Sequence, residues 1–150
     1  MMIARWTLAS EPGLARQLIA LQQRAYEVET SRIGASDAPP LSDTEADLLI
    51  ANERWVVIEF DGAVRAAASI ERRSSCLLLT RLMVDPLHLH QGLGRRLLEA
   101  IVARGDCIEV ATTAANRPAR NLYESMSFRF VESLSTDDGI ELVRYRFAAT

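Results

Sequence analysis

The stretch "VDPLHLHQGLGRRLLEAI", residues 84–101, joins an apolar segment that ends at a proline to an arginine-rich amphipathic segment. Gly92 and Gly94 stand where a helix start usually has a capping Ser, Thr, Asp or Asn. The first turn of a helix presents unpaired N–H groups and about half a positive charge. With Arg95 and Arg96 beside it, this helix start predicts a site for an anion.

Two common phosphate-binding loops do not fit this stretch. A Walker A loop requires a lysine, and all 17 basic residues of the chain are arginine. The dinucleotide fingerprint requires a third glycine three residues after Gly94, where Leu97 stands. The glycines therefore indicate another class of phosphate binder or, as the alternative, only a tight turn between a strand and a helix.

Length and composition limit the class of protein. The 150 residues are a one-domain length, so residues 1–150 are expected to form a single domain. With 49% hydrophobic residues and a net charge of −3, no nucleic-acid or membrane partner is expected. The N-terminus lacks the apolar core of a signal peptide, which predicts a cytoplasmic protein. Cys76 and Cys107 each lie at the edge of an apolar run, which favours buried reduced thiols over a disulfide or a metal site.

The N-terminal part of the chain predicts a strand and two helices. Residues 2–8 alternate as a strand, and Ser10 is placed to cap the first helix. A loop rich in Gly, Ser, Asp and Pro, residues 29–41, precedes Ser42, which with Glu45 predicts the capping box of a second helix through about Asn52. The apolar face of the first helix carries Leu14, Leu18, Leu21 and Ala25.

The remainder predicts six further strands and two helices, in an order typical of a mixed α/β (α+β) single domain. Asp61-Gly62 is a strong hairpin signal, and the run 76–84 is apolar on both faces, as in a central strand. The expected strands are 55–60, 63–71, 76–84, 107–112, 128–132 and 140–147. The expected helices run from Gly92 to Gly105, and from a cap at Asn116 with an inner face of Ala119, Leu122, Tyr123 and Met126.

A second motif, "NRPARNLYESMSF" at residues 116–128, follows the strand after the glycine stretch. Paired with "VDPLHLHQGLG", it resembles the GNAT superfamily of acyl-CoA N-acyltransferases, most clearly over residues 77–128. The resemblance implies the GNAT fold, a mixed and mostly antiparallel sheet of about seven strands flanked by four helices. It also implies an N-acetyltransferase that uses acetyl-CoA as co-substrate and no metal, and that acetylates a small primary amine by direct attack.

The resemblance further implies roles for individual residues. Tyr123 would donate a proton to the departing thiolate and lie at the coenzyme, and Asn116 would bind the pantetheine arm. Backbone groups of Leu82, Met83 and Val84 would pair with the pantetheine amides like an added strand. The pyrophosphate would be held by backbone N–H groups of His90, Gln91, Gly92, Leu93, Gly94 and Arg95.

The chain departs from the family pattern at two positions. Leu89 replaces the expected Gln or Arg, which removes one side-chain contact to the coenzyme and leaves the backbone donors in place. Ser127 replaces the usual glycine before Phe128, and strain at the end of the preceding helix is expected there.

The general base is left open by the sequence. Many relatives carry a glutamate on the strand before the phosphate loop, but the run 76–84 has no carboxylate. Glu71 and Glu109 are candidates, and a water chain is the third. His88 and His90 are interpreted as residues of the phosphate loop, with His90 near a phosphate.

The first two predicted helices and the loop between them are expected to recognise the acceptor, and their acidic residues suggest a cationic amine. The alternative is that Asp43, Glu45 and Asp47 simply suit a helix N-terminus. The acidic residues of this stretch are Glu27, Glu29, Asp37, Asp43, Glu45 and Asp47, against a lone Arg32. Two competing functions remain: a non-catalytic acyl-CoA-binding or regulatory domain of the same fold, and an α/β interaction module with purely structural motifs. The acceptor, the acyl-chain preference and whether the chain forms a homodimer stay open.

Overall fold

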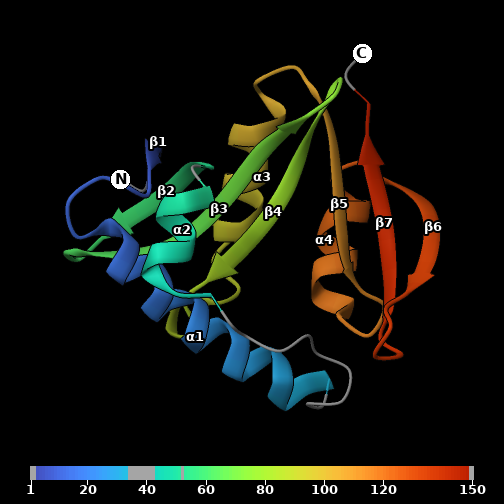
Figure 1. Cartoon of the computed structure of the whole chain (residues 1–150), viewed down its shortest axis with the longest axis horizontal. Coiled ribbons are helices and arrows are strands. Elements are labelled where there is room, and N and C mark those ends of the chain that lie inside the picture. Colours follow the sequence, from blue (N-terminus) through green and yellow to red (C-terminus); the bar gives the residue numbers. More distant parts are fainter. Residues whose placement is uncertain (1–2, 34–42, 52, 149–150) are drawn as a thin grey trace.

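A computed structural model of the chain describes residues 3–33, 43–51 and 53–148. These residues form one seven-stranded sheet in the order β1-β2-β3-β4-β5-β7-β6, with helices on both faces (Figure 1). The strands are β1 Ala4–Leu8, β2 Arg54–Phe60, β3 Ala63–Arg73, β4 Cys76–Val84, β5 Cys107–Thr113, β6 Arg129–Ser135 and β7 Glu141–Phe147. The helices are α1 Leu14–Ile33, α2 Glu45–Ala51, α3 Leu93–Val102 and α4 Arg117–Ser125, with a short 3-10 turn, η2, at Pro86–His88. The predicted fold is confirmed.

The sheet has one parallel pair of neighbours, β4 and β5, and every other neighbouring pair is antiparallel. β4 and β5 are paired only over Cys76–Leu79 and Cys107–Val110, and then they separate, as Figure 1 shows. β4 stays paired with β3 as far as Val84 on its other side. The last residues of β4 therefore have one backbone edge in the sheet and one edge turned toward the opening.

Two apolar layers hold the sheet between the helices. On one face, α3 buries Leu93, Leu97 and Ile101 against strand residues, and the predicted inner face of α4 packs on the same cluster. On the other face, Leu14, Leu18, Leu21 and Leu48 pack with Trp55 and Val57, and Ala25 packs against their edge. Full burial of one such side chain contributes about 1.5–3 kcal/mol. Among the described residues, no helix combines the length and apolar character needed to cross a membrane.

The start and end of α1 differ from the prediction. Ser10 does not cap this helix, because the chain first turns through Gly13, with φ of +77°, and α1 begins at Leu14. The helix then continues to Ile33, so the first residues of the predicted loop 29–41 are helical. Polar composition suggested a loop there, but the helix extends through these residues. The rest of that loop lies outside the described residues.

The capping box of α2 is displaced from the predicted position. The Thr44 hydroxyl accepts the Asp47 N–H at 3.2 Å, and the Asp47 carboxylate accepts the Thr44 N–H at 2.8 Å. This reciprocal pair is the capping box of α2, the role that was expected of Ser42 and Glu45. Ser42 itself lies outside the described residues, and so does Asn52, the predicted end of the helix.

Two turns follow their sequence signals. Asp61 and Gly62 both have positive φ, +54° and +77°, as a tight hairpin turn between β2 and β3 requires. Ser127, after α4, has φ of +69°, a conformation that favours glycine. The strain predicted at the end of this helix is therefore present.

The expectation of reduced thiols is wrong. Cys76 and Cys107 form a disulfide, with their Cα atoms 4.6 Å apart. They are directly opposite each other in the paired part of β4 and β5. Sequence placed each cysteine at the edge of an apolar run, but it did not show that these runs are neighbours in this register. The disulfide ties β4 to β5 at the end where the two strands are still paired.

Candidate active site

A cavity of about 790 Å³ lies where β4 and β5 separate. β4 and β5 form its two walls, and residues of α1 and α4 close it from either side. Its lining includes Gln22, Tyr26, Asp43, Glu53, Glu71, Leu79–Val84, Pro86, Leu89, Val110–Thr113, Asn116, Ala119 and Tyr123. Five predicted site residues are thus brought together in one space: Leu82, Met83, Val84, Asn116 and Tyr123.

The free edge of β4 forms one wall of this cavity. Leu82, Met83 and Val84 pair with Ala68, Ala67 and Ala66 of β3 and line the cavity on the other side. Since β5 pairs with β4 only as far as Leu79, the sheet supplies no strand partner to this edge. An extended chain with amide groups can add to such an edge through backbone hydrogen bonds.

The loop after β4 leads from the cavity to the start of α3. Leu89 still lines the cavity, whereas the predicted residues His90 to Arg95 are not among its lining residues. Gly92 is the N-cap of α3, with φ of +76°, and provides no side-chain cap. The helix therefore begins as predicted, without the side-chain oxygen that usually accepts its first N–H groups.

Packing explains the second glycine of the motif. A Cβ at Gly94 would lie 3.2 Å from Cδ2 of Leu122 in α4, closer than an ordinary contact allows. Gly92 is needed for its left-handed turn and Gly94 for this close approach. The two glycines therefore do form the tight turn between a strand and a helix that the alternative predicted. Because neither glycine has a side chain, the turn is also compatible with an anion at the helix start.

The two histidines of the loop have different surroundings. The ring of His88 packs edge-on against Phe60, with 4.8 Å between the ring centroids. His90 has φ of +63°, in the left-handed region. His88 thus stabilises the loop against β2, in keeping with its interpretation as a loop residue.

Asn116 and Tyr123 fix the α4 side of the cavity. The Asn116 side chain accepts the Ala119 N–H at 3.3 Å, which confirms the predicted cap of α4. Tyr123 is only 3% exposed, and its ring packs against Phe128 and Tyr145 at centroid distances of 5.6 and 6.0 Å. Aromatic packing therefore holds the tyrosine ring rigidly at the cavity wall.

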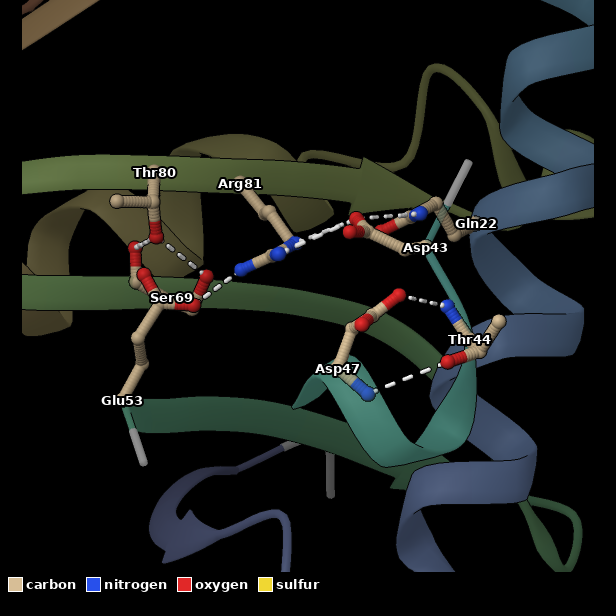
Figure 2. Close-up of polar contacts among 8 residues, drawn as sticks. All are labelled: Gln22, Asp43, Thr44, Asp47, Glu53, Ser69, Thr80 and Arg81. Carbon is tan, nitrogen blue, oxygen red and sulfur yellow. Dashed lines mark hydrogen bonds and ion pairs between the residues drawn. The ribbon is translucent and has the colours of Figure 1, made fainter. Parts of the chain in front are cut away.

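A group of polar and charged side chains from other elements also lines the cavity. We call these residues, Gln22, Asp43, Glu53 and Arg81, the Arg81 cluster (Figure 2). Asp43 Oδ2 accepts from Nε and Nη2 of Arg81 at 3.3 and 3.1 Å, and from Gln22 Nε2 at 3.1 Å. Glu53, which is buried, accepts from Nη1 of the same guanidinium. The guanidinium also lies over Trp55, 5.8 Å from the ring centroid. Arg81 thus holds two carboxylates at the cavity.

Among the acidic residues whose side chains the structure describes, one member of the predicted acidic rim lies at the cavity. Asp43 lines the cavity, but Glu27, Glu45 and Asp47 do not. Asp47 caps α2 instead, which bears out the alternative interpretation for that residue. The side chains of Glu29, Arg32 and Asp37 lie outside the part of the chain that the structure describes.

The two candidate bases differ in position. Glu71 lines the cavity and is paired with Arg73 at 2.6 Å. Glu109 is not among the lining residues, and Arg144 holds its carboxylate at 3.2 Å. The geometry therefore brings Glu71, and not Glu109, to the cavity.

Asp85 anchors the loop and was missed by the sequence analysis. It is 1% exposed, and its carboxylate accepts the Leu87 N–H at 3.0 Å. Its other oxygen accepts from Arg24 of α1 at 3.2 Å and from Arg65 of β3 at 3.4 Å. Burial alone would raise the pKa of Asp85, but these three donors outweigh it and hold the pKa below its ordinary value. Asp85 therefore ties α1 and β3 to the start of the loop.

Comparison with known proteins agrees with this geometry. The model of the Acetyltransferase (GNAT) family matches residues 15–128, which include β4, the glycine loop, α3, β5 and α4. The chain belongs to the GNAT family. As a GNAT protein, it has the sheet opening and the two motifs in the order that the resemblance implied.

Individual relatives support the same fold. "UPF0157 protein YqkA" of Bacillus subtilis (strain 168) is 31% identical over 135 residues, and these cover 88% of this GNAT chain but only 39% of YqkA. The Escherichia coli ribosomal-protein-S18-alanine N-acetyltransferase superposes with a TM-score of 0.75 at 22% identity, over 99% of this chain and 95% of that one. The Salmonella typhimurium protein yncA, solved with its cofactor acetyl-CoA, superposes with a TM-score of 0.72 at 16% identity, over 99% of this chain and 94% of that one.

Three residues of this GNAT site escaped the sequence analysis although signals were present. Arg81 is the only charged residue in the apolar run 76–84, which is unusual for a central strand. Asp85 stands directly before a proline at the end of a strand, a position that favours turns. Glu53 gave no local signal, because only the fold brings it to Arg81.

Proposed function

We propose that this GNAT protein is an N-acetyltransferase that transfers an acetyl group from acetyl-CoA to a primary amine by direct attack. The observation that carries the proposal is the cavity between the separated strands, with a free β4 edge, a buried tyrosine and a charged wall. The cavity lies next to a helix start without a side-chain cap. These features fit the parts of an acyl-coenzyme A: a phosphate end, an amide-bearing arm and a thioester.

The residues of the chain would divide the binding of the coenzyme among them. Backbone N–H groups of His90 to Arg95 would hold the pyrophosphate, helped by the α3 dipole. The β4 edge at Leu82, Met83 and Val84 would pair with the amides of the arm, and Asn116 would bind the arm from α4. Acetyl-CoA would supply the acetyl group as a thioester.

Tyr123 is the proposed general acid. A phenol with an ordinary pKa of about 10 remains protonated at neutral pH and can donate to a departing thiolate with a pKa of about 8.5. Packing against Phe128 and Tyr145 holds the ring at the cavity, so that little ordering is needed during the reaction. For the base, the cavity favours Glu71 or water over Glu109.

A cationic amine is the proposed acceptor class. Of the described residues, the charged ones that line the cavity are Asp43, Glu53 and Glu71 against Arg81, so carboxylates predominate there. Arg81 and Gln22 hold Asp43 in place, while its side chain remains 31% exposed. A fixed carboxylate at the cavity attracts a cationic amine and lowers the entropy lost when the amine binds.

The alternative function is a non-catalytic acyl-CoA-binding or regulatory domain of the same fold. Its support is the arginine pairing of the carboxylates at the cavity: Arg81 engages Asp43 and Glu53, and Arg73 engages Glu71. The tyrosine at the cavity wall counts against it. The two functions share the coenzyme site and differ in turnover.

A thiol-release assay with acetyl-CoA and a panel of primary amines separates them. The two cysteines of the chain are joined in the disulfide, so coenzyme A is the thiol that the assay detects. We expect thiol release that requires both protein and amine, and an acetylated amine by mass spectrometry. If coenzyme A raises the melting temperature but no amine promotes release, the non-catalytic function holds. If coenzyme A does not raise the melting temperature and no amine promotes thiol release from acetyl-CoA, both functions fail.

A further inference from the structure

One buried hydroxyl at the cavity wall is left without a partner. Thr113, the last residue of β5, is 4% exposed and lines the cavity. Among the residues that the structure describes, only its Oγ1 and Nε1 of Trp55 are buried side-chain polar atoms with no hydrogen-bond partner. Trp55 does not line the cavity, so of these two atoms only the Thr113 hydroxyl lies at the cavity.

The backbone carbonyl of Thr113 already has a partner, whereas its side-chain hydroxyl does not. Thr113 is paired with Leu142 of β7, and its carbonyl accepts the Asn116 N–H at 3.0 Å. A buried hydroxyl without a partner costs about 1–3 kcal/mol, so such groups are rare unless a ligand completes them. Valine has nearly the same shape and would fill this position without that cost.

The position of Thr113 indicates which part of a ligand would meet it. β5 forms the wall opposite the free edge of β4, and Thr113 is the residue of this wall nearest in sequence to Asn116 and α4. The Arg81 cluster, in contrast, comes from α1, the residues that flank α2, and β4. Thr113 therefore belongs to the coenzyme side of the cavity, where the amide-bearing arm would run.

We infer that the Thr113 hydroxyl hydrogen-bonds an amide of the pantetheine arm of acyl-coenzyme A. This inference rests on the proposed coenzyme site and adds a side-chain contact from β5 to the backbone contacts from β4. A hydroxyl both donates and accepts, so it can pair with the carbonyl or the N–H of a secondary amide. The hydroxyl would have a hydrogen-bond partner only when the arm is bound. It would therefore lower the stability of the free protein and raise its affinity for the coenzyme.

The test compares two ligands on three proteins by isothermal titration calorimetry. The proteins are wild type, Thr113→Val, which keeps the shape and removes the hydroxyl, and Thr113→Ser, which keeps the hydroxyl. The ligands are coenzyme A and adenosine 3′,5′-bisphosphate, which lacks the arm. We expect Thr113→Val to weaken coenzyme A about three- to tenfold and to leave the bisphosphate unchanged. Thr113→Ser should stay closer to wild type.

Urea unfolding without ligand gives an independent readout with a known sign. Removing an unpaired buried hydroxyl should leave the stability of Thr113→Val unchanged or raise it, whereas a structural hydroxyl would lower it when removed. Equal affinity of wild type and Thr113→Val for coenzyme A would overturn the inference. An equal loss of affinity for coenzyme A and the bisphosphate in Thr113→Val would also overturn it. So would a Thr113→Val variant that changes only the KM of the amine in the acetyl-transfer assay. If wild type binds no coenzyme A, the proposed function falls together with the inference.

Discussion

At the scale of single residues, the site depends on side chains that are held in place by their neighbours. Tyr123 is wedged between two aromatic rings, and Asp85 is held by three donors from three parts of the chain. Such residues lose little freedom when a ligand binds, because packing has already fixed them. Substitutions that keep the shape and remove one polar atom therefore test their roles cleanly.

Tyr123→Phe should lower kcat by about 100- to 10,000-fold, because it removes a positioned acid and keeps the ring. The affinity for coenzyme A should change little. Steady-state kinetics and a coenzyme titration measure the two effects separately. Tyr145→Phe is the matched control, because the Tyr145 hydroxyl bonds Glu124 and Arg120 and not the cavity. If Tyr123→Phe turns over at the wild-type rate with chemistry rate-limiting, the tyrosine is only a core residue.

Asp85→Asn should lower the free energy of unfolding at neutral pH by about 1.5–3 kcal/mol, the usual range for hydrogen bonds to a charged group. The pKa of Asp85 is depressed in the folded state, so its contribution is complete well above the unfolded pKa of about 3.9. It is lost as the pH falls through the folded pKa. In urea unfolding, the difference in the free energy of unfolding between wild type and Asp85→Asn should thus shrink from about pH 5 downward. A difference that does not depend on pH would show that the charge is not what stabilises the loop.

At the scale of elements, local signals predicted which elements form, and long-range contacts decided some of their ends. The hairpin turn at Asp61-Gly62, the cap at Asn116 and β4 at Cys76–Val84 agree with the sequence, because each is specified by adjacent residues. The start of α1 and the capping box of α2 do not. The turn through Gly13 delays the start of α1 to Leu14, and Thr44 and Asp47 form the capping box of α2.

The disulfide belongs to the same scale, since it joins two elements that the sequence alone cannot align. It closes a loop with a sequence separation of 31 residues, for which loop-closure entropy gives a stabilisation of about 2–4 kcal/mol. Cys76→Ala together with Cys107→Ala should lower the free energy of unfolding by that amount in urea. In denaturant without reductant, wild type should show no reactive thiol, whereas two reactive thiols would contradict the disulfide.

At the scale of the whole molecule, the sequence predicted the fold better than it predicted the Arg81 cluster. The residues proposed to bind the coenzyme come from two contiguous motifs and the strands before them. The Arg81 cluster combines Gln22, Asp43, Glu53 and Arg81, which are far apart in the chain. No local pattern marks Glu53, because its partner is 28 residues away.

The charge of the cavity predicts how the acceptor responds to salt. If a cationic amine is drawn to Asp43, raising the ionic strength should raise its KM, since exposed charges are screened over about 8–10 Å. Asp43→Asn should raise KM and flatten this dependence, with little effect on coenzyme affinity. Asp47→Asn, which removes the same charge from the cap of α2, is the control. An unchanged KM across salt, or a preference for anionic amines, would reject the cationic acceptor.

The central claim is that the start of α3 holds the pyrophosphate of the coenzyme, and calorimetric titration of coenzyme A into Arg95→Glu tests it most directly. Gly94 is less informative, because any side chain there would press on Leu122. A glutamate at position 95 suits the first turn of a helix, so stability should be kept, but it would repel the pyrophosphate. We predict at least about a tenfold loss of affinity in Arg95→Glu. Arg129→Glu, at the exposed start of β6, should bind like wild type. Wild-type affinity in Arg95→Glu would contradict the claim and place the coenzyme elsewhere.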